Sequence, residues 1–405
     1  MGFWKKLFGG GEGEAPASPR DHFAAEVEAC LRQLPQVSTV KTRDDFALDV
    51  TITGGGVHTV FMENTFHETR DMSPDERMVR ISRLVSGIGQ EEELDWESAK
   101  ERLVPLVRAC TVFAGVVPDA DKQPLSRVVL PFLVETVVID SEANMRYVTP
   151  STVEEWGVDP ETVFRHAQEN AERFFDIDDA EIYEQKDDST IWHVTRDDSY
   201  ESSRLLLPGW LASFRGKVNG NPVAIVPERA KLFVAGDGDV LCLERLLDMA
   251  EREYAASRRS ISPAMYTVDD TGAVIPLALP DKHPLRNPVA LGHARLALAE
   301  YDIQQKVLQK DREEDVFVAS YVAVQREDGT ITSYSTWTDG VPTWLPKTDD
   351  VALVGGNPED PTVLRVPWEA MEGMLRELPD VYPPRFETGD WPDAADLEKL
   401  RAVAL

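Results

Sequence analysis

Hydrophobic and polar residues follow two rhythms along this chain, and each rhythm predicts one kind of element. A repeat every three to four positions, as at Phe23, Val27 and Leu31, is typical of an amphipathic helix, whereas strict alternation is typical of a half-buried strand. The first rhythm predicts helices over residues 21–34, 73–88, 159–175, 199–214, 239–256, 290–310 and 368–378. The second, with short apolar runs, predicts strands over residues 46–52, 57–62, 103–113, 132–139, 145–149, 191–196, 223–226, 232–234, 316–325, 330–337, 351–354 and 363–366, and a hairpin over 265–277.

One helix start is marked clearly. Ser73 is followed by Pro74 and Glu76, which is the order of a capping box with proline at the first helical position. We therefore expect that helix to begin directly after Ser73.

Changes in composition divide the chain into a tail and three units. A Gly-rich linker, an acidic run at 91–93 and four prolines between 276 and 288 interrupt the apolar rhythm. We predict a flexible tail (1–20), an N-terminal α+β unit (21–90), a central α+β unit (91–280) and a C-terminal helix–meander–helix domain with an antiparallel sheet (290–405). The predicted fold class is α+β, with mixed and antiparallel sheets and packed helices.

The chain is strongly acidic, with 42 basic and 72 acidic residues and a formal net charge of −30. A field of this sign repels phosphate backbones and anionic lipid headgroups, and no Lys/Arg cluster interrupts it, so we expect no nucleic-acid binding. The acidity favours solubility; the alternative is a docking face for a basic partner. The three cysteines lie far apart beside apolar residues, which fits buried thiols in a reducing cytosol.

The N-terminal segment has features of a membrane-contacting helix. Phe3, Trp4, Leu7 and Phe8 would share one helical face beside two lysines, but the segment lacks the apolar core of a signal peptide. Two helical turns are marginal alone, so we favour a flexible or partner-bound tail over transient membrane contact through these four residues. No apolar run approaches the roughly 20 residues of a membrane span. The expected location is therefore cytoplasmic.

Residues 198–277 carry a recognisable order of motifs. The stretch opens with D-S-Y-E-S-S-R-L-L, continues through V-A-I-V-P-E-R-A-K-L-F-V-A and closes with the hairpin M-Y-T-V-D-D-T-G-A-V-I-P-L. This order resembles the bacterial family of domain of unknown function 1444, the YtpQ-like proteins, over roughly residues 25–280. The resemblance implies an α+β fold. It supplies no catalytic or ligand residue, because none is established for that family, and the region after about residue 285 has no counterpart in its short members.

The D-S-Y-E-S-S-R run is the first candidate site, through Asp198, Tyr200, Ser203 and Arg204. At a helix entry, free backbone amides and an Arg fork can bind an anion or orient a peptide carboxylate. Alternatively, Asp198 or Ser199 caps the helix and Arg204 pairs with a neighbouring acid, which we favour. Ser203 also lacks the G-x-S-x-G turn that exposes a hydrolase nucleophile.

Tryptophans are dense in the last domain, and Trp337 and Trp344 are the second candidate site. We favour a core or sheet-face role; the alternative is an aromatic-lined groove for a peptide. The seven histidines form no H-E-x-x-H motif and no Cys/His pair at zinc spacing, and no acidic cluster has the calcium-loop pattern. We therefore expect no metal and no cofactor.

These observations favour a non-catalytic protein-binding or adaptor module that engages an unidentified protein partner. The alternative is a hydrolase-type enzyme whose site is assembled around the helix entry at residues 198–204, with a histidine such as His193. Catalytic groups that are distant in sequence leave no local motif, so this alternative stays open.

Overall fold

The chain has an α+β fold, as predicted, and forms two compact units. Unit 1 comprises residues 1–95 with 141–145, and unit 2 comprises residues 96–140 and 146–405. The computed structural model describes residues 18–43, 46–54, 56–88, 94–114, 120–141, 145–175, 179–186, 189–194, 200–257, 259–310, 316–357 and 359–405. The tail residues Phe3, Trp4, Leu7 and Phe8 lie outside these ranges.

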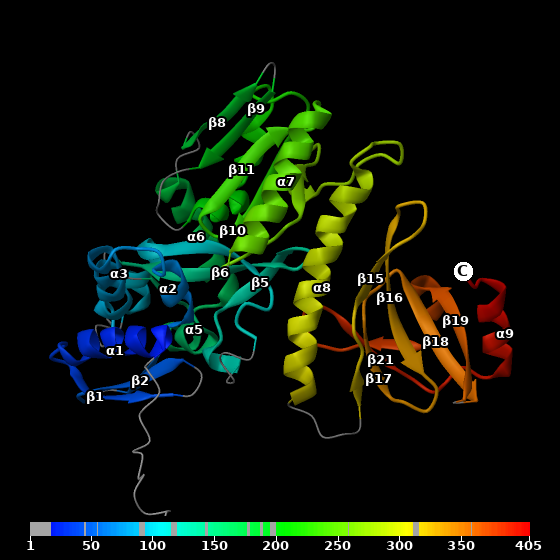
Figure 1. The fold of residues 1–405 in the computed structure, drawn as a ribbon, viewed down its shortest axis with the longest axis horizontal. Coiled ribbons are helices and arrows are strands. Elements are labelled where there is room, and N and C mark those ends of the chain that lie inside the picture. The colour runs from blue at the N-terminus through cyan, green and yellow to red at the C-terminus, as the bar shows by residue number, and fades with distance from the viewer. Residues whose placement is uncertain are drawn as a thin grey trace, which may run out of the picture. The chain divides into compact units, whose positions relative to one another are not determined.

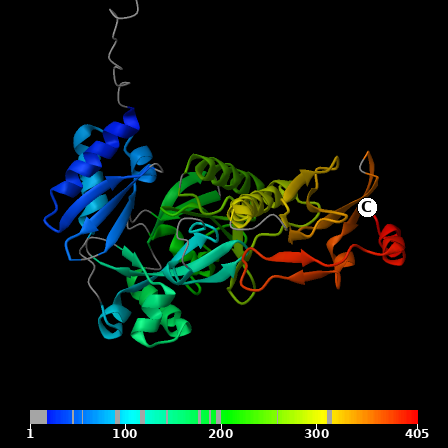
Figure 2. The same ribbon diagram turned by 90° about the horizontal axis from the view of Figure 1, so that it is seen from below.

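Unit 1 packs helices on one face of a three-stranded antiparallel sheet of order β1-β2-β3 (Figure 2). Its elements are α1 (Pro19–Arg32), β1 (Val37–Thr42), β2 (Ala47–Ile52), β3 (Val57–Phe61), α2 (Glu63–Glu68) and α3 (Pro74–Ser86). Phe23, Val27 and Leu31 of α1 are buried in its core, as their spacing predicted. The sequence pattern missed β1, because Val40 is its only buried residue and no alternation results.

The capping box at Ser73 is confirmed. The Glu76 amide donates to Ser73 Oγ at 3.4 Å, and the Ser73 amide donates to Glu76 Oε2 at 2.9 Å. These two bonds satisfy amides that a helix start otherwise leaves free, so α3 begins directly after Ser73, at Pro74.

The first part of unit 2 carries two sheets. One has the order β4-β6-β5, with β7 also paired to β6, and the other is an antiparallel sheet of order β13-β12-β10-β11-β9-β8. The strands are β4 (Leu103–Ala109), β5 (Ser126–Leu130), β6 (Leu133–Asp140), β7 (Met145–Tyr147), β8 (Ala180–Lys186), β9 (Ser189–Val194), β10 (Pro222–Glu228), β11 (Lys231–Gly236), β12 (Met265–Val268) and β13 (Val274–Pro276).

Helices cover these sheets. They are α4 (Trp96–Ala99), α5 (Pro150–Trp156), α6 (Pro160–Phe174) and α7 (Val240–Ala256), with short 3₁₀ turns η1 (Lys100–Arg102), η2 (Ala120–Lys122), η3 (Glu201–Leu206) and η4 (Leu211–Phe214). Figure 1 shows α7 running along β10 and β11, where Leu243, Leu246 and Leu247 join the core with Val223 and Ile225. A helix over 199–214 with a break near Pro208 and Gly209 was predicted. The structure instead has two 3₁₀ turns, Glu201–Leu206 and Leu211–Phe214, on either side of that break.

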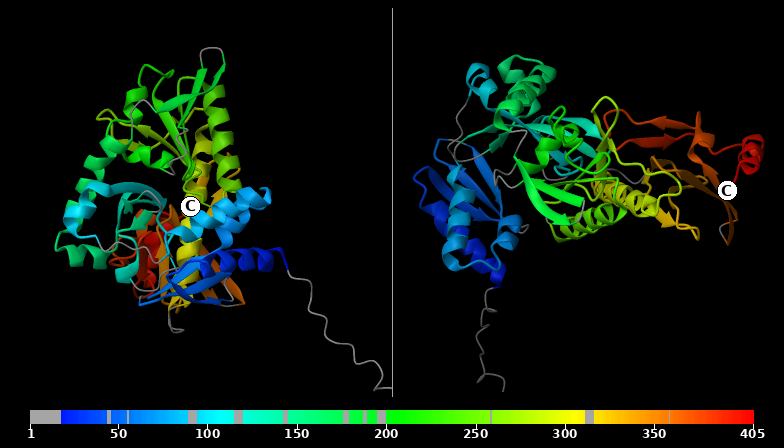
Figure 3. Two further views of the ribbon diagram at one scale, coloured as in Figure 1. Left: turned by 90° about the vertical axis from the view of Figure 1, so that its left-hand side faces the viewer. Right: turned by 90° about the horizontal axis from the view of Figure 1, so that it is seen from above.

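The last part of unit 2 begins with the long helix α8 (Arg286–Lys310), which runs beside strands β15 and β16 (Figures 1 and 3). Two four-stranded sheets follow, of order β14-β17-β21-β20 and β15-β16-β18-β19. Their elements are β14 (Phe317–Val318), β15 (Val322–Gln325), β16 (Ile331–Thr338), β17 (Thr343–Pro346), β18 (Asp350–Asn357), β19 (Asp360–Pro367), η5 (Trp368–Met371), β20 (Leu375–Glu377), β21 (Arg385–Thr388) and α9 (Ala394–Ala402).

Two predictions for this region were wrong. The expected helix over 368–378 is a 3₁₀ turn followed by β20, because Gly373 takes a left-handed φ of 87° that interrupts a right-handed helix. The expected antiparallel meander contains parallel pairs, since β16 runs parallel to β18 and β14 runs parallel to β17. The reason is that β17 lies between β16 and β18 in the chain but joins the other sheet, so β18 returns in the direction of β16.

Candidate functional site

The D-S-Y-E-S-S-R run is buried from Tyr200 onward, and Asp198 lies outside the described residues. Ser203 is fully buried on η3, and its Oγ accepts a hydrogen bond from the Val107 amide of β4 at 3.3 Å. The Tyr200 hydroxyl donates to Asp140 Oδ1 at 2.5 Å. A hydroxyl sealed in this way has no access to a substrate, so the geometry around Ser203 offers the hydrolase alternative no support.

Arg204 is engaged in the interior. Its Nη2 and Nε donate to Asp179 Oδ2 at 2.6 and 3.0 Å, and its guanidinium lies 4.7 Å from the ring centroid of Phe175. Both charged side chains are at most 2% exposed. The neighbouring Ser202 amide donates to the Arg229 carbonyl at 3.2 Å. The run therefore ties η3 to the surrounding core through polar contacts.

Trp337 and Trp344 are also buried, at 2% and 5% exposure. Trp337 meets Trp391 edge-on, with ring centroids 5.1 Å apart. Trp344 packs with Val318 and Leu378. The structure thus places these indoles within packed clusters, and an accessible site has to be sought elsewhere.

The described part of unit 2 does contain a hollow of about 660 Å³, a size typical of ligand pockets. One wall is the run of five consecutive residues from Val128 to Phe132. The first three, Val128 to Leu130, belong to β5, and Pro131 and Phe132 form the turn that follows it. Successive side chains of a strand point to opposite faces, so three strand neighbours in a row line a hollow where the strand presents its edge. β5 is an edge strand, since among the described strands it pairs with β6 alone.

We call this hollow the β5–α8 groove. Small side chains of α8 line it, and three tyrosines from separate segments complete its aromatic surface. The lining residues beyond β5 include Ala290, Ala294, Ala297, Tyr301, Tyr321, Ser333, Lys347, Asp349 and Tyr382. The groove is therefore mainly apolar, with polar groups at Ser333, Lys347 and Asp349.

Phe132 is held in an unusual backbone conformation at the end of this strand edge. Its φ is 63°, a left-handed value that costs a non-glycine residue about 1–2 kcal/mol. Tertiary contacts compensate: the Phe132 amide donates to the Tyr382 hydroxyl at 2.9 Å, and its ring meets Tyr301 edge-on at 5.5 Å. Strain of this kind clusters at functional sites, and Phe132 is one of the residues that line the groove.

Beside Phe132, a buried carboxylate joins α8 to the β4–β6–β5 sheet. Glu300 Oε2 accepts hydrogen bonds from the Thr111 amide and hydroxyl, both at 2.8 Å, and from the Cys110 thiol at 3.3 Å. The Cys110 amide in turn donates to the Phe132 carbonyl at 3.0 Å. Burial raises the pKa of Glu300 although these donors oppose the shift, and burial together with the Glu300 charge raises the pKa of the Cys110 thiol.

This junction makes stability depend on pH. Because the folded-state pKa of Glu300 lies above its unfolded value, its contribution is complete below about pH 4.5 and is lost as the pH rises through the folded pKa. The change is about 1.4 kcal/mol for each unit of pKa shift. We expect Glu300→Gln to gain free energy of unfolding relative to the wild type as the pH rises, measured by urea unfolding at a series of pH values. Glu398→Gln, at an exposed position, is the control; equal pH profiles for the two variants would contradict the assignment.

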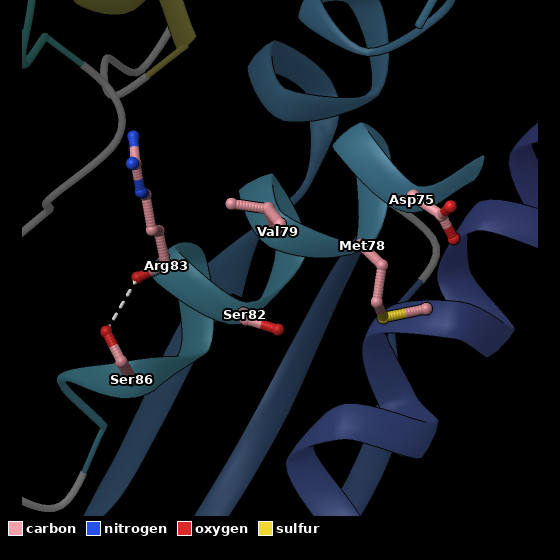
Figure 4. Close-up of a pocket in the computed structure, with 6 residues that line it drawn as sticks. All are labelled: Asp75, Met78, Val79, Ser82, Arg83 and Ser86. Carbon is pink, nitrogen blue, oxygen red and sulfur yellow. Dashed lines mark hydrogen bonds between the residues drawn. The ribbon is translucent and has the colours of Figure 1, made fainter. Parts of the chain in front are cut away.

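A second hollow, of about 450 Å³, lies on unit 1 and is lined by Asp75, Met78, Val79, Ser82, Arg83 and Ser86. Figure 4 shows that all six come from the single helix α3, with Met78 pointing toward α1, where the Cys30 thiol lies 3.4 Å from its sulfur. A helix surface without a second wall cannot enclose a ligand. We therefore assign it no role and take the β5–α8 groove as the candidate site.

Sequence reasoning missed this groove. Tyr301, Tyr321 and Tyr382 stand far apart in the chain, so no local motif joins them. The available signal was S-R-V-V-L-P-F at 126–132, a β-branched run closed by a proline, which is typical of a strand followed by a turn.

Two further properties bear on function. Among the residues that the structure describes, no group of three or more His, Cys, Asp or Glu side chains is placed to hold a metal ion. None of the described helices is long and apolar enough to cross a membrane.

Comparisons with protein-family models, with curated proteins and with solved structures returned no match to this chain.

Proposed function

We propose that this chain is a non-catalytic, cytoplasmic protein-binding module that takes up an extended segment of a partner protein in the β5–α8 groove. The observation that carries the proposal is that the last three residues of the edge strand β5, Val128 to Leu130, line the groove in succession. An unpaired strand edge offers backbone donors and acceptors, and an extended peptide can satisfy them by adding a strand. We also propose that residues 25–280 are related to the YtpQ-like proteins that they resemble.

The groove also suits side chains of such a segment. Ala290, Ala294 and Ala297 present small side chains of α8 to the groove. The rings of Tyr301 and Tyr321 are stacked, with centroids 5.3 Å apart and 17° between their planes. Small floor residues and aromatic walls accommodate aliphatic or aromatic anchors of a peptide. Backbone pairing along β5 would supply affinity, and the anchors would supply selectivity.

Selection from a phage-displayed library of random peptides tests the proposal. We expect peptides with alternating apolar residues, whose affinity drops at least about tenfold on Val128→Lys, because a charged side chain then replaces an apolar one on the edge strand. Ala290→Trp, which fills the groove from the α8 side, should have the same effect.

Val363→Lys is the matched control. Val363 also stands on an edge strand, β19, and is 61% exposed compared with 51% for Val128. Selected peptides that bind Val128→Lys and Ala290→Trp as tightly as the wild type would overturn the proposal.

A further inference from the structure

Asp349 gives the β5–α8 groove a fixed negative group. Its Oδ2 accepts hydrogen bonds from the Ser333 amide at 2.7 Å and the Ser333 hydroxyl at 2.8 Å, and the Asp349 amide donates back to Ser333 Oγ at 3.0 Å. Within the described part of the chain, Oδ1 has no hydrogen-bond partner. One carboxylate oxygen is thus anchored, and the other is free to accept a bond from a ligand.

The charges around Lys347, two residues before Asp349, are mostly negative. Lys347 lines the groove too, but its ammonium lies 4.3 Å from the ring centroid of Trp368, and the carboxylates of Glu369 and Glu372 are close enough to act on its pKa. Burial nevertheless lowers the pKa of Lys347. Lys347 therefore stands among three carboxylates, on a chain whose formal net charge is −30. The adjacent Asp350 is paired with Arg326 and Arg365 at 3.4 and 2.7 Å, so these two cations are already engaged.

We infer that the segment bound in the groove is basic: a Lys or Arg side chain pairs with Asp349 Oδ1 while neighbouring apolar side chains lie over the alanines of α8. A charge-assisted hydrogen bond to a pre-oriented carboxylate rewards a cation, and the surrounding acidic field disfavours an anion at the same place. This inference rests on the proposed function, because it specifies the partner of the same groove.

Defined peptides test it with the full-length protein. The probes are fluorescently labelled peptides of about nine residues that alternate valine and threonine, long enough to span about 30 Å. Their central residue is lysine, norleucine or glutamate, and binding is followed by fluorescence anisotropy at low ionic strength. A partly exposed ion pair should favour the lysine peptide over the norleucine peptide about two- to fivefold, and over the glutamate peptide about tenfold.

Charge reversal at Asp349 is the decisive comparison. Asp349→Lys should invert the preference, so that the glutamate peptide binds more tightly than the lysine peptide. Asp349→Asn keeps an oxygen that can accept from Ser333 but loses the charge, so it should abolish most of the preference for lysine. Asp390→Lys changes the net charge equally at another exposed position and should leave the preference intact. Thermal unfolding of each variant checks that the fold persists.

The outcomes separate the two proposals. The basic-segment inference alone is overturned if peptide binding is lost in Val128→Lys but the wild type binds the lysine, norleucine and glutamate peptides equally. It is also overturned if Asp349→Lys keeps the preference of the wild type for the lysine peptide. If no peptide binds Val128→Lys more weakly than the wild type, the proposed function itself is overturned. Tighter peptide binding by the Lys5→Glu/Lys6→Glu protein would show that the chain's own basic N-terminus fills the groove, which overturns the assignment to a partner protein.

Discussion

Replacing Arg204 by alanine should lower the free energy of unfolding by about 3–5 kcal/mol, because it leaves Asp179 buried without its cation. The two side chains are 1% and 2% exposed, and both bonds from Arg204 end on the same oxygen, Oδ2. Asp179→Ala should be similarly destabilising, since the buried guanidinium loses the carboxylate oxygen that accepts two of its hydrogen bonds. Urea unfolding followed by tryptophan fluorescence measures both changes.

The double variant tells a buried ion pair from two independent contacts. Each single variant leaves one buried charge without its partner, whereas the double variant leaves neither charge. The loss in free energy of unfolding of the double variant should therefore be clearly smaller than the sum of the losses of the two single variants. Arg165→Ala is the control, because Arg165 and Glu169 form a pair that is 55% and 56% exposed. Its effect should stay within about 0.5 kcal/mol. Additive losses in the double variant would show that Arg204 and Asp179 act separately.

Replacing Arg385 by methionine should destabilise the protein by at least about 3 kcal/mol, because several buried acceptors lose their donor at once. The guanidinium donates to Gln304 Oε1 at 2.6 Å and to the carbonyls of Ala319, Trp344 and Tyr301 at 2.8, 3.1 and 3.3 Å. No carboxylate of the described residues forms an ion pair with it. Burial lowers its pKa to about 10, so it is still charged at neutral pH.

Arg376→Met provides the comparison for Arg385→Met. Arg376 lies on the adjacent strand β20 and is 74% exposed, so its loss should change the free energy of unfolding by no more than about 0.5 kcal/mol. Because Arg385 ties α8 to β17 and β21, its replacement should also weaken peptide binding in the β5–α8 groove. A stable Arg385→Met protein with unchanged peptide affinity would contradict this role.

Local sequence determined much of the fold of this protein. The α1 spacing, the capping box at Ser73 and the helix that follows Asp239 all appear where predicted. These features depend on contacts within a few residues, where side-chain periodicity and free backbone amides act directly. The hairpin at 265–277 is of the same kind, with Gly272 at a φ of 88° in its turn.

Strand pairing and the candidate site were decided by tertiary structure. Whether β17 continues one sheet or joins another depends on contacts that four residues ending in Pro346 do not encode. The sequence left two interpretations of the run up to Arg204 open, an anion site or a pairing of Arg204 with an acid. Only the structure identified Asp179 and Val107 as the partners that allow its burial. A sequence shows which groups can bond, but not which distant groups come within reach.

The β5–α8 groove illustrates the same division. Sequence alone determined that the chain is acidic and that it alternates between helix and strand, whereas the strand β5 at residues 126–130 was not predicted. Only the tertiary structure set the edge of β5 against α8 and brought Tyr301, Tyr382 and Asp349 to one hollow. The physical reason is distance along the chain: periodicity reports neighbours within one element, whereas a groove is made by packing between elements that are far apart in sequence.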